Sequence, residues 1–231
     1  MEVGPLDRKA RHRRDGAIVT AENVRFRVAR ADPSRGEDSD IILVAASHRG
    51  VLRVDIDVDE RLLRERLSAW SRTRLPGVAP RELAREDESG GDPTIDAAVH
   101  AVRVALGTRE SRESRDSSAT GRSAAEGIPL DERGTALQLL VWRALRAIPA
   151  GSTASYAVLA KAVGKPRAAR AVANACGANP IAILVPCHRA VRSDGSLGGY
   201  RWGIGLKKAI LALEAANAAR ATARGTRPVK S

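Results

Sequence analysis

Two adjacent side chains near the C-terminal end of the chain, Cys187 and His188, have the types needed for nucleophilic chemistry. A thiol attacks as its thiolate, and a neighbouring base helps to form the thiolate near neutral pH. Pro186 precedes the pair and cannot donate to a strand ladder, so the apolar run 181–185 is predicted to be a strand that ends there. Cys187 would then lie on a bend. The alternative is that Cys187 is a small core residue, as most free cysteines are.

A carboxylate could orient the base. Apolar residues at helical spacing predict a helix over about 206–219, and Glu214 falls on its inward stripe. A carboxylate that faces a core is costly unless it has a partner. His188 is the obvious candidate, although periodicity alone leaves open that Glu214 lies at the exposed edge of the helix.

Upstream of the cysteine, the sequence predicts two short helices joined by a tight glycine turn. Ser155 can cap the first helix, and the second is expected over 166–176, with proline at its first position. Such a pair is typical of a helix-turn-helix. Three polar residues at spacings of three and four share one face of the second helix among alanines, which would allow close approach to nucleic acid: Arg167, Arg170 and Asn174.

The charge distribution indicates a polyanion as partner. Residues 1–127 hold 23 basic and 23 acidic residues, whereas residues 128–231 hold 16 basic and 4 acidic residues, so the whole net charge of +12 lies in the half that contains Cys187. A basic surface is typical of proteins that bind nucleic acid. The alternative, a high arginine content from a GC-rich genome, predicts balanced acids in both halves.

Other classes of protein fit the composition poorly. No apolar stretch is long enough to cross a bilayer, and the two cysteines are too few for a disulfide framework or a cysteine-rich zinc site. The low aromatic content of 3% weakens the case for a sheet that stacks single-stranded bases. We therefore expect a cytoplasmic protein without a metal, a cofactor or a membrane partner.

The patterning predicts an α/β N-terminal subdomain, a small sheet with helices, followed by a mainly α C-terminal domain with the helix-turn-helix. Strands are expected over 24–28, 41–46 and 51–58, and helices over 60–70 and 95–106. A segment rich in Ser, Arg and Glu separates the two parts, because it has too few apolar residues to order itself. The predicted division is a basic flexible tail (1–19), an N-terminal α/β domain (20–107), a flexible linker or insertion (108–127), a DNA-binding domain that contains the candidate nucleophile Cys187 (128–219) and a basic disordered tail (220–231).

Together these motifs resemble the O6-alkylguanine-DNA alkyltransferases, also called methylated-DNA–protein-cysteine S-methyltransferases. The resemblance covers about residues 130–214 and joins a nucleophile motif, a helix-turn-helix and a pocket loop in order. The first half of the chain is only loosely similar. The residues that carry the resemblance are Arg133-Gly134-Thr135, Val141-Trp142, Ile148-Pro149, Ser155-Tyr156, Arg170-Ala171, Asn179-Pro180, Val185-Pro186-Cys187-His188-Arg189 and Gly198-Gly199-Tyr200-Arg201-Trp202-Gly203.

The resemblance implies a DNA repair protein that acts once. Cys187 would attack the O6-alkyl carbon of a damaged guanine and become S-alkylcysteine, with O4-methylthymine as a minor substrate. His188 would deprotonate Cys187 through a water, and Glu214 would stabilise the imidazolium. Asn179 would brace the turn, and Tyr156 would donate toward guanine N3 so that the base leaves neutral.

The resemblance also implies how a monomer would bind double-stranded DNA that contains O6-alkylguanine. Arg170 would fill the gap left by the flipped nucleotide, with the helix in the minor groove and Arg167 and Asn174 beside it. Tyr200 would form a wall of the pocket. Further substrate contacts would come from the backbone of Ala190 and Arg201 and from Trp202, which would hinder bulky bases.

Two other functions compete with alkyl transfer. Alkyltransferase-like proteins bind lesions without reacting, but they have Trp at the nucleophile position, where this chain has Cys187. A Cys-His hydrolase would use the same nucleophile and base, but it gives no reason for the basic half. Some relatives hold zinc near the N-terminus; this chain has no cysteine before Cys176, so no metal is expected.

Overall fold

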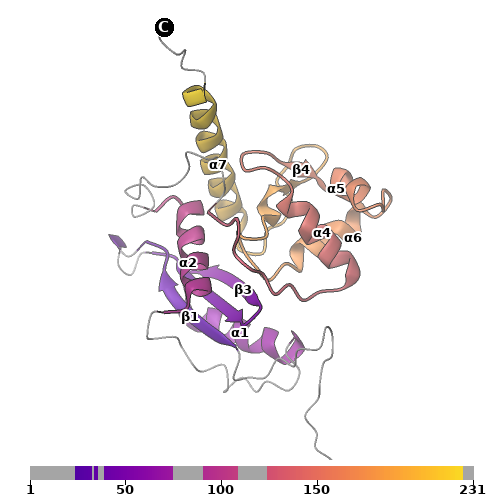
Figure 1. The fold of residues 1–231 in the computed structure, drawn as a ribbon. Helices are drawn as coiled ribbons and strands as arrows, with labels where there is room; N and C mark the ends of the chain where they lie inside the picture. Colours follow the sequence, from indigo (N-terminus) through magenta and orange to yellow (C-terminus); the bar gives the residue numbers. More distant parts are fainter. Residues whose placement is uncertain (1–23, 33, 36–38, 75–90, 109–123, 226–231) are drawn as a thin grey trace, which may run out of the picture.

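The computed structural model describes residues 24–32, 34–35, 39–74, 91–108 and 124–225, and its first half is a small sheet between two helices (Figure 1). The predicted tail 1–19 and residues 109–123 of the predicted linker lie outside the described residues. Strands β1 (Arg25–Arg30), β2 (Ile41–Ser47) and β3 (Gly50–Asp57) form an antiparallel sheet in that order. The expected N-terminal sheet is therefore confirmed.

Helices α1 (Glu60–Arg74) and α2 (Pro93–Ala105) cover opposite faces of the sheet, because the strands are apolar on both sides (Figure 1). Ile42 and Val44 belong to the main core with α2, whereas Leu43 and Ala45 belong to a second core with α1. Successive strand residues point to opposite faces, so the alternation follows from strand geometry. Asp92 caps α2 by accepting from the backbone N–H of Thr94 at 2.9 Å.

The free edge of β3 is closed by two segments of the second half of the chain. Val51 N–H donates to the carbonyl of Pro129 at 2.8 Å, and Val54 N–H donates to the carbonyl of Pro180 at 3.0 Å. The Val54 carbonyl in turn accepts from Ala182 N–H at 3.1 Å. An unpaired strand edge would leave these backbone groups without partners, so the sheet and the second half complete each other.

The second half is mainly helical. Helix α4 (Ala136–Arg146) begins with a capping box between Thr135 and Gln138 and packs on α6 (Ala169–Gly177) through buried Trp142, whose indole donates to the carbonyl of Ala175 at 2.9 Å. The remaining elements are β4 (Ala154–Ser155), α5 (Tyr156–Ala162), the 3-10 helix η4 (Cys187–Arg189), β5 (Ala190–Val191) and α7 (Ile204–Gly225). Strands β4 and β5 pair in parallel.

One predicted strand is wrong. Residues 181–185 form buried turns, and only Ile181 makes an isolated bridge, with Val54 of β3. The side chain of Asn179 explains the difference, because its amide donates to the carbonyls of Ile181 at 3.2 Å and Val185 at 2.9 Å and thereby folds the run back on itself. An Asn side chain can compete in this way with backbone pairing.

Three predicted boundaries also differ. Helix α6 begins at Ala169 rather than at residue 166, so Arg167 lies in the turn before the helix. Helix α7 runs to Gly225, so residues 220–225 of the predicted disordered tail are helical, in line with the high helix propensity of their alanines. Ala124 and Ala125, inside the predicted linker, pack against the main core. Helices α5 and α6 pack together, and their identity as a DNA-binding helix-turn-helix remains a prediction.

Candidate active site

The thiol of Cys187 lies at the start of η4, directly after the turn that Asn179 holds together. Asn179 is buried, and its side-chain N–H2 lies 3.2 Å from Cys187 Sγ while also bonding the carbonyls of the turn. Its Oδ1 accepts from Ile181 N–H at 2.9 Å. One amide therefore fixes both the backbone before the nucleophile and the sulfur itself.

The same turn contains a strained residue. Ile183 has a φ of 68°, a left-handed conformation that is rare for a β-branched residue. Such strain costs about 1–3 kcal/mol and persists only where surrounding contacts enforce it, most often at functional sites. The bonds from Asn179 and the burial of the whole turn supply that enforcement here.

The ring of His188 is held by a carboxylate on the far helix. His188 is 1% exposed, and its Nε2 lies 3.0 Å from Glu214 Oε1. Burial lowers the pKa of His188, an effect that the Glu214 hydrogen bond opposes. His188 Nδ1 is buried and has no hydrogen-bond partner in the described part of the chain. A neutral ring that donates Nε2–H to Glu214 would leave Nδ1 as a base.

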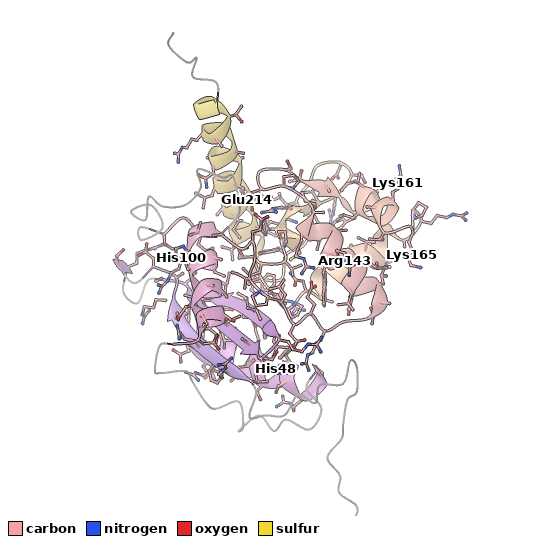
Figure 2. All side chains as sticks on the ribbon, in the orientation of Figure 1. His48, His100, Arg143, Lys161, Lys165 and Glu214 are labelled. Atoms are coloured by element: carbon pink, nitrogen blue, oxygen red, sulfur yellow. The ribbon has the colours of Figure 1, made fainter. Side chains whose placement is uncertain are left out.

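Glu214 is itself fixed by a neighbour of the nucleophile. The Arg189 guanidinium donates to Glu214 at 2.7 Å and to the carbonyl of Ile148 at 2.6 Å, and the backbone N–H of Gly151 donates to Glu214 at 3.2 Å. Although burial opposes ionisation, the bonds from His188 and Arg189 lower the pKa of Glu214 to about 2. Figure 2 shows Glu214 pointing from α7 toward the helices of the second half. Sequence reasoning paired Glu214 with His188 but missed Arg189.

The two cysteines differ in their surroundings. Burial raises the pKa of the Cys187 thiol, while the Asn179 hydrogen bond and the nearby Lys207 and Arg201 charges oppose that rise. Burial raises the pKa of Cys176 to about 12, with an additional contribution from Cys187. Both thiols therefore rest protonated, and only Cys187 lies beside a buried base.

Lys207 is a second residue that sequence reasoning missed. Its ammonium group is buried and donates to the carbonyls of Ala190, at 2.6 Å, and Leu197. It thus ties α7 to β5, which follows the nucleophile, and to the start of the glycine-rich loop 197–203, here called the pocket loop. Helical spacing from Ile210 and Glu214 could have placed Lys207 on the inward stripe.

The glycine-rich loop brings two aromatic rings to the site. The Tyr200 ring lies edge-on to His188, with centroids 6.4 Å apart, and edge-on to Trp202, with centroids 5.1 Å apart. The Tyr200 hydroxyl is buried without a partner among the described residues. At Gly198, where φ is 65°, an added Cβ would lie 3.0 Å from the Tyr156 hydroxyl, so glycine permits this close approach.

Tyr156 begins α5 and is half-buried, and burial raises the pKa of its hydroxyl, which favours the protonated form. Ala190 is buried in β5. Arg201 is exposed and donates to the carbonyl of Gly177 at 2.9 Å. The structure therefore joins Asn179 to Cys187 and His188 to Glu214, and it places Tyr200 beside His188, Trp202 beside Tyr200 and Tyr156 beside Gly198. The roles of these residues remain predictions.

The predicted DNA contacts lie apart from this buried cluster. Arg170 and Asn174 are exposed on α6, four residues apart, and Arg167 is exposed in the preceding turn. Lys161 and Lys165 project at the outer end of α5 (Figure 2). An exposed cationic edge formed by two short helices is suited to phosphate contact.

The described residues contain no cluster of three or more His, Cys, Asp or Glu side chains that could hold a metal ion. Within the same residues, no helix is long and apolar enough to cross a bilayer.

Comparisons with known proteins identify the family. The family described as 6-O-methylguanine DNA methyltransferase, DNA binding domain, matches residues 136–216. The chain is 41% identical over 199 residues to the Escherichia coli bifunctional transcriptional activator/DNA repair enzyme Ada, which covers 86% of this chain and 48% of that protein. It is 39% identical over 150 residues to the inducible methylated-DNA–protein-cysteine methyltransferase of Bacillus subtilis, which covers 65% of this chain and 72% of that protein.

Solved structures give the same result. The structure of Mycobacterium tuberculosis OGT in complex with DNA aligns with a TM-score of 0.53 and 29% identity over 83% of this chain and 93% of that one. The chain spans about half the length of the two Ada proteins that it matches. Because it covers most of the Bacillus subtilis relative, the chain belongs to the methylated-DNA–protein-cysteine methyltransferase family.

Proposed function

We propose that this protein repairs DNA by transferring the alkyl group of O6-alkylguanine to the sulfur of Cys187. The observation that carries the proposal is the series Asn179, Cys187, His188 and Glu214, of which the first three are buried and Glu214 is partly buried. In it the sulfur is held by an amide and the adjacent imidazole by an ionised carboxylate. Membership of the family and the names of its relatives support the same activity.

The proton of the thiol is the first to move. His188 Nδ1 takes it from Cys187, through a water molecule, while Nε2–H remains hydrogen-bonded to Glu214 and the ionised carboxylate stabilises the imidazolium. The 3.2 Å contact from Asn179 and the positive charge of Lys207 favour the thiolate that results.

Alkyl transfer then exchanges one bond for another. The thiolate attacks the alkyl carbon, a carbon–sulfur bond forms, and the bond between that carbon and guanine O6 breaks. Tyr156 donates a proton toward guanine N3, so the base leaves neutral, and the proton on His188 restores the balance. In sum, the thiol hydrogen replaces the alkyl group. The alkyl group then stays on Cys187 as a stable thioether, so each protein molecule acts once.

Access to the base requires that the damaged nucleotide leave the duplex. The α6 face supplies Arg170 to fill the gap, with Asn174 and Arg167 on the adjoining backbone and the helix in the minor groove. Tyr200 and Trp202 line the pocket, and the backbone of Ala190 and Arg201 contacts the guanine edge. In this proposal the protein acts as a monomer, in the cytoplasm.

The test is intact mass before and after incubation with duplex DNA that contains O6-methylguanine, followed by peptide mapping. We expect a gain of one methyl group, on the peptide with Cys187, and none in Cys187→Ser, which should still bind DNA. Methylation of Cys176 would overturn the assignment. Tight lesion binding without a mass change would favour a lesion-binding protein, and repeated turnover of esters or peptides would favour a hydrolase.

A further inference from the structure

Two charged side chains are buried on β3, far from the acceptor residues in sequence. Arg53 is 3% exposed and Asp55 is 0% exposed, and the guanidinium Nε donates to Asp55 Oδ2 at 2.8 Å. A buried ion pair is often no more stabilising than apolar residues of similar size, because both charges lose their hydration. Stability alone is therefore a weak reason for these two charged side chains to be buried on β3.

The second oxygen of the same carboxylate reaches the pocket loop. Asp55 Oδ1 accepts a hydrogen bond from the indole N–H of Trp202 at 2.6 Å, although 147 residues separate the two. Trp202 packs edge-on against Tyr200, and Tyr200 packs edge-on against His188. A continuous series of contacts thus leads from Asp55 in the sheet, through Trp202 and Tyr200, to His188.

We propose that Asp55 is a positioning residue for alkyl transfer, which holds Trp202 and thereby fixes Tyr200 beside His188. The proposal rests on the proposed function. Arg53 donates to Asp55 Oδ2, and its guanidinium lies over the ring of Trp70 in α1, 5.5 Å from the centroid. Arg53 therefore fixes one oxygen of the carboxylate, and Oδ1 is left to accept from Trp202. A hydrogen bond to a charged acceptor is both shorter and stronger than one between neutral groups.

Val54, the residue before Asp55 in β3, contacts the segment that leads to Cys187. Val54 pairs through its backbone with Pro180 and Ala182, next to Asn179 and the turn that leads to Cys187. The nucleophile turn and the pocket loop therefore both rest on residues 54 and 55 of one strand. The N-terminal sheet thus acts as the support on which the two parts of the acceptor site are aligned.

Two substitutions change the hydrogen bond between Trp202 and Asp55, one at the donor and one at the acceptor. Trp202→Phe removes the indole N–H and keeps an aromatic ring and the buried Arg53–Asp55 pair, so it avoids leaving a buried charge unpaired. Asp55→Asn weakens the acceptor. In single-turnover transfer from O6-methylguanine duplex, we expect each change to lower the rate at saturating DNA about tenfold, the effect of one hydrogen bond to a charged group. The double variant should be no slower than the slower single variant, because both remove the same interaction.

Ser47→Ala is the matched control. Ser47 Oγ donates to Asp131 at 2.8 Å, a buried hydrogen bond that also joins the sheet to the second half but does not involve the pocket loop. This variant should lose stability and keep the wild-type transfer rate. Amide hydrogen exchange over 197–203 should rise in Trp202→Phe and Asp55→Asn and remain unchanged in Ser47→Ala.

Two results would overturn the proposal. One is unchanged exchange over 197–203 in both loop-contact variants. The other is an additive loss of rate in the double variant, which would show that the two residues act separately. A wild-type protein that accepts no methyl group would refute the proposed function instead, and the exchange comparison would still decide whether Asp55 holds the loop.

Discussion

Replacing Glu214 by Gln tests the electrostatic basis of the acceptor site, because the change removes one charge and keeps the shape. In the wild type, the carboxylate accepts from His188, Arg189 and the backbone of Gly151. The variant would leave the Arg189 guanidinium, which is largely buried, without its counterion. We therefore expect losses of both stability and transfer rate.

The stability change follows from the pKa of Glu214, which folding lowers from 4.5 to about 2. At about 1.4 kcal/mol for each unit, the ionised group contributes about 3 kcal/mol at neutral pH. Little of this is lost to solvent screening, because the side chain is only 12% exposed. Since the folded pKa is the lower one, the contribution is complete above pH 4.5 and is lost as the pH falls toward 2, so about 1.5 kcal/mol remains near pH 3.

The transfer rate of Glu214→Gln should fall even where the variant is fully folded. In Glu214→Gln, Arg189 will attract the amide oxygen of the new side chain, which turns the amide N–H2 toward His188 Nε2. That arrangement favours the tautomer with its proton on Nδ1, where it can no longer accept the thiol proton. A wrong tautomer has a cost of several orders of magnitude in comparable triads, and we expect a loss of at least about 100-fold.

Urea unfolding of wild type and Glu214→Gln near pH 7 and pH 3, together with single-turnover transfer, measures both effects. Glu132→Gln is the control, because Glu132 pairs with Arg146 at 2.8 Å and is 15% exposed but contacts no residue of the site. It should leave the transfer rate unchanged. A stability gap for Glu214→Gln that stays constant between the two pH values would refute the reasoning, as would a transfer rate equal to that of the wild type.

Three further predictions concern the turn held by Asn179, nucleotide flipping by Arg170 and the exposed lysines near the end of α5. Asn179→Ala should lower the free energy of unfolding by about 2–4 kcal/mol and slow transfer, because it leaves the turn carbonyls unpaired, and urea unfolding would measure this. Arg170→Ala should slow transfer from duplex DNA far more than reaction with free O6-benzylguanine, once wild type is shown to react with it; equal losses would argue against a flipping role. Lys161→Ala combined with Lys165→Ala should reduce the salt slope of binding to undamaged duplex, measured by fluorescence anisotropy, without changing the rate at saturating DNA.

Much of the site could be predicted from local sequence. Cys187 and His188 are adjacent, and helical spacing placed Glu214 on the inward stripe of α7, where it meets His188. The strands of the first half and the uneven distribution of charge also required no tertiary information, because apolar patterning and composition are properties of the chain itself.

Tertiary structure decided what local patterns leave open. An apolar run such as 181–185 fits a buried strand or a buried turn equally well, and the amide of Asn179 selected the turn. Arg189, Lys207 and Asp55 have hydrogen-bond partners 10 to 147 residues away, which the local periodicity does not predict. The residue types that could do chemistry were therefore legible in the sequence. Their alignment arose only when the free edge of β3 paired with the second half, because buried backbone and charged groups must find partners wherever the fold provides them.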